Sequence, residues 1–202
     1  MKKELDILEQ KFTEITLNYI EIETCYYHDV LNQSSYQKIS KGALLNVRPF
    51  ETQLAGFKLG KELTKLPKSI KNTHVYYFDH ADNVLMIEIY GQTETIIHRQ
   101  YYFYTDECIE SIYFNHGGTL RNITLSTHRD NHIDQLINYA TFGYSVSQYV
   151  YDHETLVAIN VQQKEHGQDM HTNFQVIFEY EDCYLSKIIR QYPNGYEEKR
   201  YP

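Results

Sequence analysis

Two histidines and an aspartate stand close together in the segment Thr127-His-Arg-Asp-Asn-His132. The best metal-ligand spacing in the chain is found here, with imidazoles at His128 and His132 and a carboxylate at Asp130. Zinc sites usually need a third or fourth protein ligand, which would have to come from another segment. The alternative is an exposed loop whose histidines are solvated. The three residues are therefore candidate metal ligands, and we expect no bound cofactor.

Carboxylates set among strand aromatics are the next groups that could do chemistry. Glu88, Glu110 and Glu179 stand in such positions, where a raised pKa would suit general acid–base catalysis. The same residues also fit the polar face of alternating strands. The three cysteines form no Cys-x-x-Cys pair, and no nucleophile elbow, phosphate-binding glycine loop or HExxH motif occurs. These absences favour a non-enzymatic role.

Charge is divided unevenly along the chain. Residues 1–72 hold 11 Lys+Arg against 9 Asp+Glu, whereas residues 73–202 hold 8 against 18, a net of −10. Such a surface repels nucleic acid and anionic membrane and suits a basic protein partner, although acidic residues also simply keep a protein soluble. Among the 20 tyrosines, which make good contact residues, we expect the partner to be bound by Tyr101, Tyr113, Tyr149 and Tyr151, with Glu110 and Asp152.

These residues must be positioned by a long run of strands. Turn signals recur about every 8–12 residues from Thr73 to Tyr201, which predicts consecutive antiparallel pairing. Residues 133–139 fit a short helix or a strand equally well. The strands expected are residues 74–78, 84–90, 95–104, 108–115, 120–127, 142–151, 156–163, 172–180, 184–192 and 196–201.

The first third of the chain indicates helices. Leu5, Leu8, Phe12, Ile15 and Tyr19 alternate spacings of three and four, which predicts an amphipathic helix over residues 3–20 that packs on the sheet. The stripe continues to about residue 31, although residues 20–26 would also suit a strand. Residues 38–71 are basic, and a lysine row over residues 57–66 predicts a short helix that ends before a proline. The lysine row is a solvated face or a site for phosphates or an acidic partner.

The fold class that follows is α+β. An N-terminal helix and a short basic helix pack on a long, curved antiparallel meander of about ten strands. Residues 1–72 form the helical N-terminal segment and residues 73–202 the meander, together one compact domain.

One local pattern recurs in this meander. An aromatic residue is followed five positions later by an aliphatic one and three positions after that by an isoleucine. The copies are Tyr104, Ile109, Ile112; Tyr151, Leu156, Ile159; and Tyr180, Leu185, Ile188.

A related segment, Phe114-Asn-His-Gly-Gly-Thr-Leu120, resembles the tyrosine-aspartate (YD) repeat, in which an aromatic–Asp pair enters a glycine turn and a leucine leaves it. Degenerate copies extend the resemblance over residues 74–201. The resemblance implies stacked hairpins and no catalytic residue. YD-repeat proteins often carry polymorphic bacterial toxins, so it also implies the neighbourhood of immunity proteins that neutralise them.

The function we expect is therefore binding of a basic protein by a non-enzymatic module, such as an immunity protein or antitoxin. A small-molecule binder or hydrolase with a His/Glu-lined site inside a curved sheet is the alternative, and a structural fragment of a larger assembly is a third. The charged start Met-Lys-Lys-Glu-Leu-Asp and the lack of a long apolar run predict a cytoplasmic protein.

Overall fold

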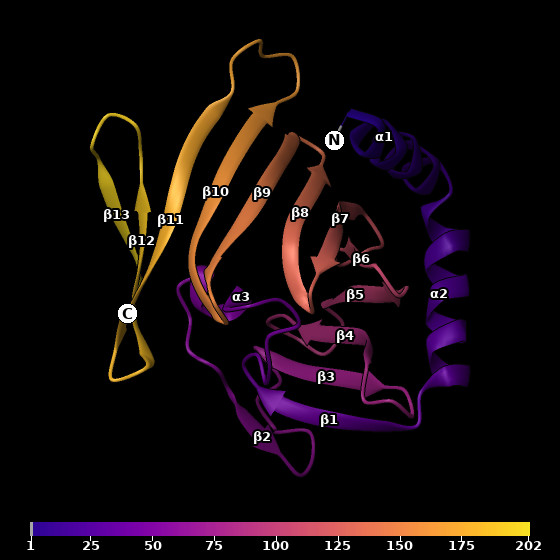
Figure 1. Ribbon diagram of the computed structural model, residues 1–202. Coiled ribbons are helices and arrows are strands. Elements are labelled where there is room, and N and C mark those ends of the chain that lie inside the picture. The colour runs from indigo at the N-terminus through magenta and orange to yellow at the C-terminus, as the bar shows by residue number, and fades with distance from the viewer. Residues whose placement is uncertain (1) are drawn as a thin grey trace.

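The computed structural model describes residues 2–202, which form three helices and one 13-stranded antiparallel sheet (Figure 1). From β3 onward each strand pairs with the next one in sequence, so the sheet is a meander as expected. The strands are β1 Tyr36–Lys41, β2 Lys61–Leu63, β3 Thr73–Phe78, β4 Val84–Tyr90, β5 Ile97–Tyr104, β6 Cys108–Phe114, β7 Leu120–Arg129, β8 His132–Ala140, β9 Gly143–Asp152, β10 Thr155–Glu165, β11 Thr172–Glu181, β12 Tyr184–Gln191 and β13 Glu197–Tyr201.

Two of the three strands beyond the ten expected arise because the sheet reaches into the basic segment. β1 pairs with β3, and β2 pairs with β1, so the sheet crosses the boundary drawn at residue 72. The helix predicted over residues 57–66 is wrong, since Lys61–Leu63 is a strand. Gly60 explains the difference: its backbone crosses so close to β1 that an added Cβ would lie 2.1 Å from the Lys41 carbonyl oxygen. The ambiguous residues 133–139 belong to a strand, β8.

The N-terminal stripe forms two helices rather than one. α1 spans Lys2–Leu17 and α2 spans Tyr19–Gln33, with a non-helical backbone at Asn18. The break lets α1 pack on β7 and β8 while α2 reaches β5, where the Tyr26 ring lies 5.0 Å from that of Phe103. Leu8, only 1% exposed, joins the core with the rest of the expected stripe. The prediction that this stripe packs on the sheet is confirmed.

The sheet curls around the segment that precedes and includes α3 (Glu51–Leu54), as Figure 1 shows. Leu44 and Leu45 pack against the inner face of β3–β5, whereas Phe50 and Leu54 pack against β10–β12. One short segment can contact strands so far apart only if the sheet bends around it. Arg48 is 7% exposed inside the curl, where its Nη1 donates to Thr124 Oγ1 at 2.6 Å and its Nη2 to Glu51 Oε1 at 2.5 Å.

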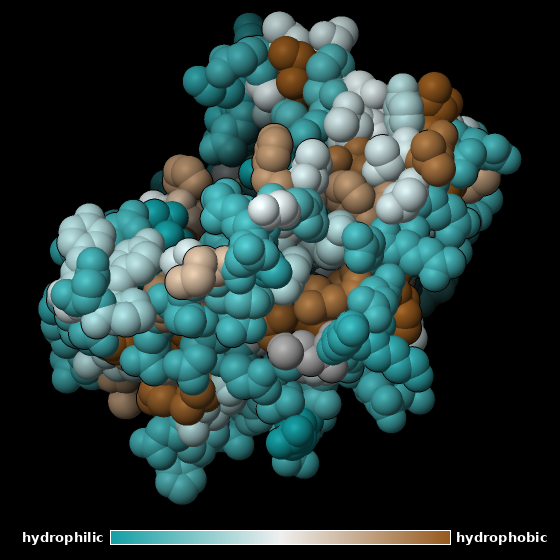
Figure 2. Space-filling model, turned by 90° about the horizontal axis from the view of Figure 1, so that it is seen from above, coloured by the Kyte–Doolittle hydropathy of each residue, from teal (hydrophilic) through white to brown (hydrophobic). Residues whose placement is uncertain are grey.

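The face of the molecule seen from above is mostly hydrophilic (Figure 2). Seen from above, hydrophobic side chains come to the surface in separate patches divided by hydrophilic ones (Figure 2). None of the helices within residues 2–202 combines the length and the apolar character that a membrane-spanning helix needs.

Candidate functional site at the acidic rim

Carboxylates gather along one turn edge of the sheet, which is the border formed by the strand ends and the hairpin turns that join them. In a meander, alternate hairpin turns lie at the same edge, and the turns β3–β4, β5–β6, β7–β8, β9–β10 and β11–β12 share this one. Neighbouring hairpins touch here, since the His128 N–H of β7 donates to Glu107 O of the β5–β6 turn at 3.0 Å. Counting each turn with the strand residue before it, this edge, the acidic rim, holds nine carboxylates: Asp79, Asp82, Asp106, Glu107, Asp130, Asp152, Glu154, Glu181 and Asp182. The opposite edge, counted in the same way over the described chain, holds three: Glu94, Glu165 and Asp169.

Turn geometry accounts for part of this asymmetry. Asp130 and Asp182 have φ values of 51° and 50°, and aspartate tolerates this left-handed region better than most residues. Asp152 and Glu181 end strands instead, and Glu154 has no positive φ. Turn chemistry therefore does not require the last three carboxylates, and they give the rim much of its charge.

A cavity of about 670 Å³ opens at this rim between three hairpins and the segment inside the curl. Its volume falls in the range of small-ligand sites. Val47, Phe50 and Leu156 supply apolar lining, and His132, Tyr151 and Glu154 supply polar groups. We call it the rim cavity.

The recurring aromatic–aliphatic pattern builds the wall of the rim cavity. Tyr151 pairs with Leu156 across the β9–β10 turn, and Tyr180 pairs with Leu185 across the β11–β12 turn. His128 and Ile133 form an equivalent pair across the β7–β8 turn. Because the members of a cross-strand pair project to the same face, each hairpin presents one ring and one aliphatic group at the mouth of the curl.

The polar side of the rim cavity is organised around His132. Its Nε2 lies 3.0 Å from Glu154 Oε2, its Nδ1 lies 3.0 Å from the Asp130 carbonyl oxygen, and its ring packs on Tyr151 with centroids 4.6 Å apart. Both ring nitrogens thus lie within hydrogen-bond distance of an oxygen. A neutral imidazole can donate to only one of these oxygens, whereas an imidazolium can donate to both. Glu154, with 88% of its side chain exposed, keeps its second carboxylate oxygen available at the mouth.

The structure does not bring the candidate metal ligands His128, Asp130 and His132 together as a metal site. Among residues 2–202, no group of three or more His, Cys, Asp or Glu side chains is close enough together to hold a metal ion. Asp130 occupies a left-handed turn position and accepts from His132 through its backbone, so the spacing of His128, Asp130 and His132 reflects a tight hairpin.

The six expected partner-binding residues separate into three pairs. Tyr151 lines the rim cavity, and Asp152 stands exposed beside it on the rim. Tyr149 is 8% exposed beneath them, where burial raises the pKa of its hydroxyl to about 12. Tyr101 is completely buried, so neither of these two can anchor a partner on the surface.

The other two expected contact residues are engaged within the chain. Glu110 forms an ion pair with Lys11 of α1. Tyr113 is half-buried, and the guanidinium of Arg121 lies 5.2 Å from its ring centroid. Alternation in a strand could not separate these cases, because α1 and α2 cover part of one face of the sheet and the segment before α3 covers part of the other.

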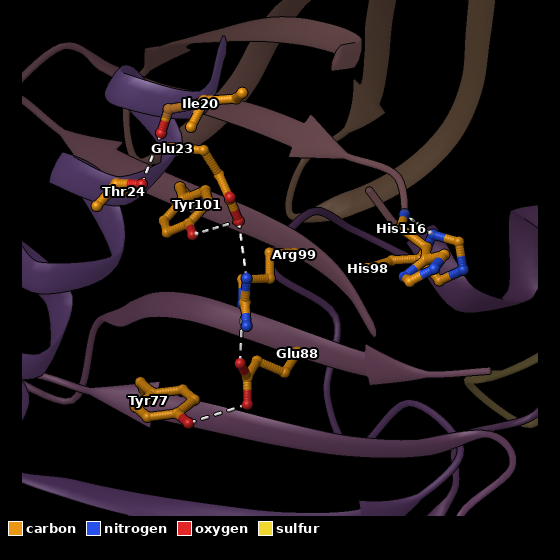
Figure 3. Close-up of polar contacts among 9 residues, drawn as sticks. All are labelled: Ile20, Glu23, Thr24, Tyr77, Glu88, His98, Arg99, Tyr101 and His116. Atoms are coloured by element: carbon orange, nitrogen blue, oxygen red, sulfur yellow. Dashed lines mark hydrogen bonds and ion pairs between the residues drawn. The ribbon is translucent and has the colours of Figure 1, made fainter. Parts of the chain in front are cut away.

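Tyr101 and Glu88 belong to a buried network beneath α2. The guanidinium of Arg99 lies between two carboxylates, with Nε 2.9 Å from Glu88 Oε1 and Nη1 2.9 Å from Glu23 Oε1 (Figure 3). Tyr77 donates to Glu88 at 3.0 Å, and Tyr101 donates to Glu23 at 3.2 Å. Burial, reinforced by the carboxylates, raises the pKa of both tyrosines. Glu88 is therefore a structural residue that helps to hold α2 on the sheet.

Sequence reasoning missed the side of the rim cavity that comes from the segment before α3. The rim cavity is lined on this side by Val47, Pro49 and Phe50. A segment that enters a curl has no repeating hydrophobic pattern from which it could be predicted. The available signal was the Arg-Pro-Phe step, because proline disfavours a helical conformation in the residue before it. In the structure, Phe50 follows with a left-handed φ of 55°.

The fold and the site together define an α+β protein in which a curled antiparallel meander opens, at an acidic rim, onto a largely apolar cavity. No family model matches the chain, and no curated protein matches it.

Proposed function

We propose that this protein is a non-enzymatic module that binds a basic protein at the acidic rim. The observation that carries the proposal is the charge asymmetry of nine carboxylates against three at the two edges, joined to a cavity on the acidic side. A row of like charges speeds the approach of an oppositely charged partner, and a concave, partly apolar pocket supplies the anchor that charge alone does not give.

The chemistry of the rim cavity suits a long cationic side chain from that partner. Phe50, Leu156 and Tyr180 offer apolar and aromatic contacts for an aliphatic stem or a guanidinium plane. Glu154 stands at the mouth with an exposed carboxylate that can pair with the charged end. An arginine of the partner satisfies both requirements at once.

The biological role we propose is that of an immunity protein or antitoxin, which masks the basic surface of a toxin. The acidic rim supports a masking role through charge complementarity, and the resemblance to YD repeats supports the toxin neighbourhood by association. In this mechanism the rim covers the basic surface of the toxin and excludes its target, without any chemical step.

The second candidate is a small-molecule site in the same cavity. The volume of about 670 Å³ and the mixture of apolar lining with the polar groups of His132, Tyr151 and Glu154 favour it. In that case a small ligand, rather than a protein side chain, fills the rim cavity.

A matched pair of variants tests the proposal. The rim variant carries Asp152→Asn, Glu154→Gln and Asp182→Asn, and the control carries Glu94→Gln, Glu165→Gln and Asp169→Asn at the opposite edge, so the change in net charge is equal. Each protein is immobilised and exposed to lysate of the native cell at low salt. We expect the wild type and the control to retain the same basic protein and the rim variant to lose it. Retention of no protein, or equal retention by all three, contradicts the proposal.

A further inference from the structure

Amide side chains form a continuous row across the outer face of the sheet, the face opposite to the curl. Successive register partners on β8–β12 are all glutamine or asparagine: Gln135, Gln148, Asn160, Gln175 and Gln191. Gln162 and Asn173 form a second cross-strand pair beside this row. Helices α1 and α2 cover the outer face over β4–β8 and the start of β9, where Tyr144 and Val146 join their core. The amides farther along β9–β12 are left open or partly open to solvent (Figure 1).

Several of these amides bond to one another, while Gln191 Nε2 donates to Glu197 Oε1 of β13 at 2.8 Å. These bonds do not use up the hydrogen-bonding capacity of the amides. Gln175 Nε2 donates to Asn160 Oδ1 at 2.9 Å, and Gln135 Nε2 donates to Gln148 Oε1 at 3.1 Å. A carboxamide has two N–H donors and a carbonyl oxygen with two lone pairs, so each bond leaves further donors and acceptors on both partners. The cross-strand bonds fix the orientation of these groups and leave an ordered set of hydrogen-bonding sites facing outward.

A cavity of about 470 Å³ lies over this set of amides. Its lining includes Gln148, Asn160, Gln162, Asn173, Gln175 and Gln191, and no Asp, Glu, Lys, Arg or His contributes to it within the described chain. We call this cavity the amide groove. It shares no lining residue with the rim cavity, so it is a separate place on the molecule.

We propose that the amide groove binds a neutral sugar. A sugar hydroxyl both donates and accepts a hydrogen bond, as a carboxamide does, so adjacent hydroxyls can bridge the free groups of two neighbouring amides. A charged ligand would lose hydration here without gaining an opposite charge, which disfavours phosphates and acidic sugars. The volume of the groove lies in the range of small-ligand sites.

The position of the amide groove excludes the main competing use of a sheet, the addition of a peptide strand. The groove lies over β9–β12, and all four strands are hydrogen-bonded to neighbours on both sides. A peptide can add to a sheet only beside an outermost strand with unpaired backbone N–H and C=O groups, and this region has no such strand. Recognition here has to proceed through side chains, which suits a compact ligand rich in hydroxyls.

The test uses the full chain, labelled with ¹⁵N, and neutral trisaccharides of glucose, galactose, mannose and N-acetylglucosamine. Side-chain amide resonances are followed by NMR during titration, and affinity is measured by calorimetry. We expect one of these sugars to bind with a Kd of about 1 mM or lower and to shift the amides of Asn160 and Gln175. The double variant Asn160→Ala/Gln175→Ala should weaken binding about tenfold or more, a loss of about 1.4 kcal/mol.

Gln163→Ala is the matched control, because Gln163 is exposed on β10 next to Gln162 but projects to the opposite face. It should bind the sugar as the wild type does, and so should the rim variant with Asp152→Asn, Glu154→Gln and Asp182→Asn. The proposal is overturned if none of the four sugars binds at about 10 mM. Binding that shifts no resonance of the amide groove also overturns it, and this readout does not depend on whether the double variant folds. Loss of the protein partner in the rim variant leaves this outcome unaffected, so the two proposals fail separately.

Discussion

Arg99 Nε lies 2.9 Å from Glu88 Oε1, and this contact joins two strands of the sheet at the point where α2 crosses them. The same guanidinium reaches Glu23 of α2 and lies with its carbon 4.6 Å from the centroid of the Tyr27 ring. Glu88 is only 4% exposed, so its charge depends on Arg99 and Tyr77 for compensation. One cation shared between two carboxylates thus links α2 to the sheet.

Arg99→Met should destabilise the protein strongly, because it leaves the buried Glu88 carboxylate without its cation. Removing one partner of a buried ion pair typically costs about 3–5 kcal/mol. Lys187→Met is the matched control, since Lys187 pairs with Glu179 at 2.9 Å but both side chains are 43% exposed. Because it is exposed to solvent, that pair should contribute little to stability. Urea unfolding measures both values, and equal losses for the two variants would show that the Arg99 network is not needed for stability.

His74 should make stability depend on pH. Burial lowers the pKa of His74 to about 4 in the folded protein, below its ordinary value near 6.5 in an unfolded chain. The unfolded state therefore binds a proton first as pH falls, so the contribution of His74 is complete above pH 6.5. It is lost progressively between pH 6.5 and 4, by up to about 3 kcal/mol.

His74→Gln removes this titrating group. The difference in unfolding free energy between wild type and variant should change across pH 6.5 to 4 and stay constant above it. Urea unfolding at a series of pH values measures this difference, and a difference independent of pH over the whole range would contradict the assignment.

Gly60→Ala should separate β2 from β1. The added Cβ would lie 2.1 Å from the Lys41 carbonyl oxygen, so the backbone must shift, at a cost of about 1–3 kcal/mol. Gly167→Ala is the control, because nothing lies within 4 Å of its Cβ position and only the strain of its φ of +77° remains. Hydrogen exchange should show faster exchange in β1 and β2 for Gly60→Ala alone. Unchanged protection of β1 would mean that the crossing at Gly60 is not tight.

The sequence predicts the meander well because its signals are local. Each cross-turn pair, such as Tyr104 with Ile109, lies within one hairpin, and the turn residues between them have their own chemistry. The isoleucine three positions later is buried in every copy, as Ile112, Ile159 and Ile188 show. The curl is different, since it depends on a segment whose contacts lie far away in the sequence.

The wrong predictions of contact residues also arise because packing between segments far apart in the sequence is not visible in local patterns. Tyr101 and Tyr151 look alike in the sequence, but α2 covers the first and the second borders an open cavity. The asymmetry of the acidic rim was present in the turn residues, yet it becomes visible only when alternate turns are assigned to one edge. Packing of distant segments therefore decides which residues form the site, and local patterns decide which strand carries them.

The most direct test of the central claim measures the affinity of the captured basic protein for three forms of this chain. Calorimetry at low salt compares the wild type with the rim variant (Asp152→Asn, Glu154→Gln, Asp182→Asn) and with the opposite-edge variant (Glu94→Gln, Glu165→Gln, Asp169→Asn). The account predicts a Kd raised about tenfold or more in the rim variant and changed by less than about twofold in the other. Equal affinities for the two variants would contradict it, because binding would then follow net charge and not the acidic rim.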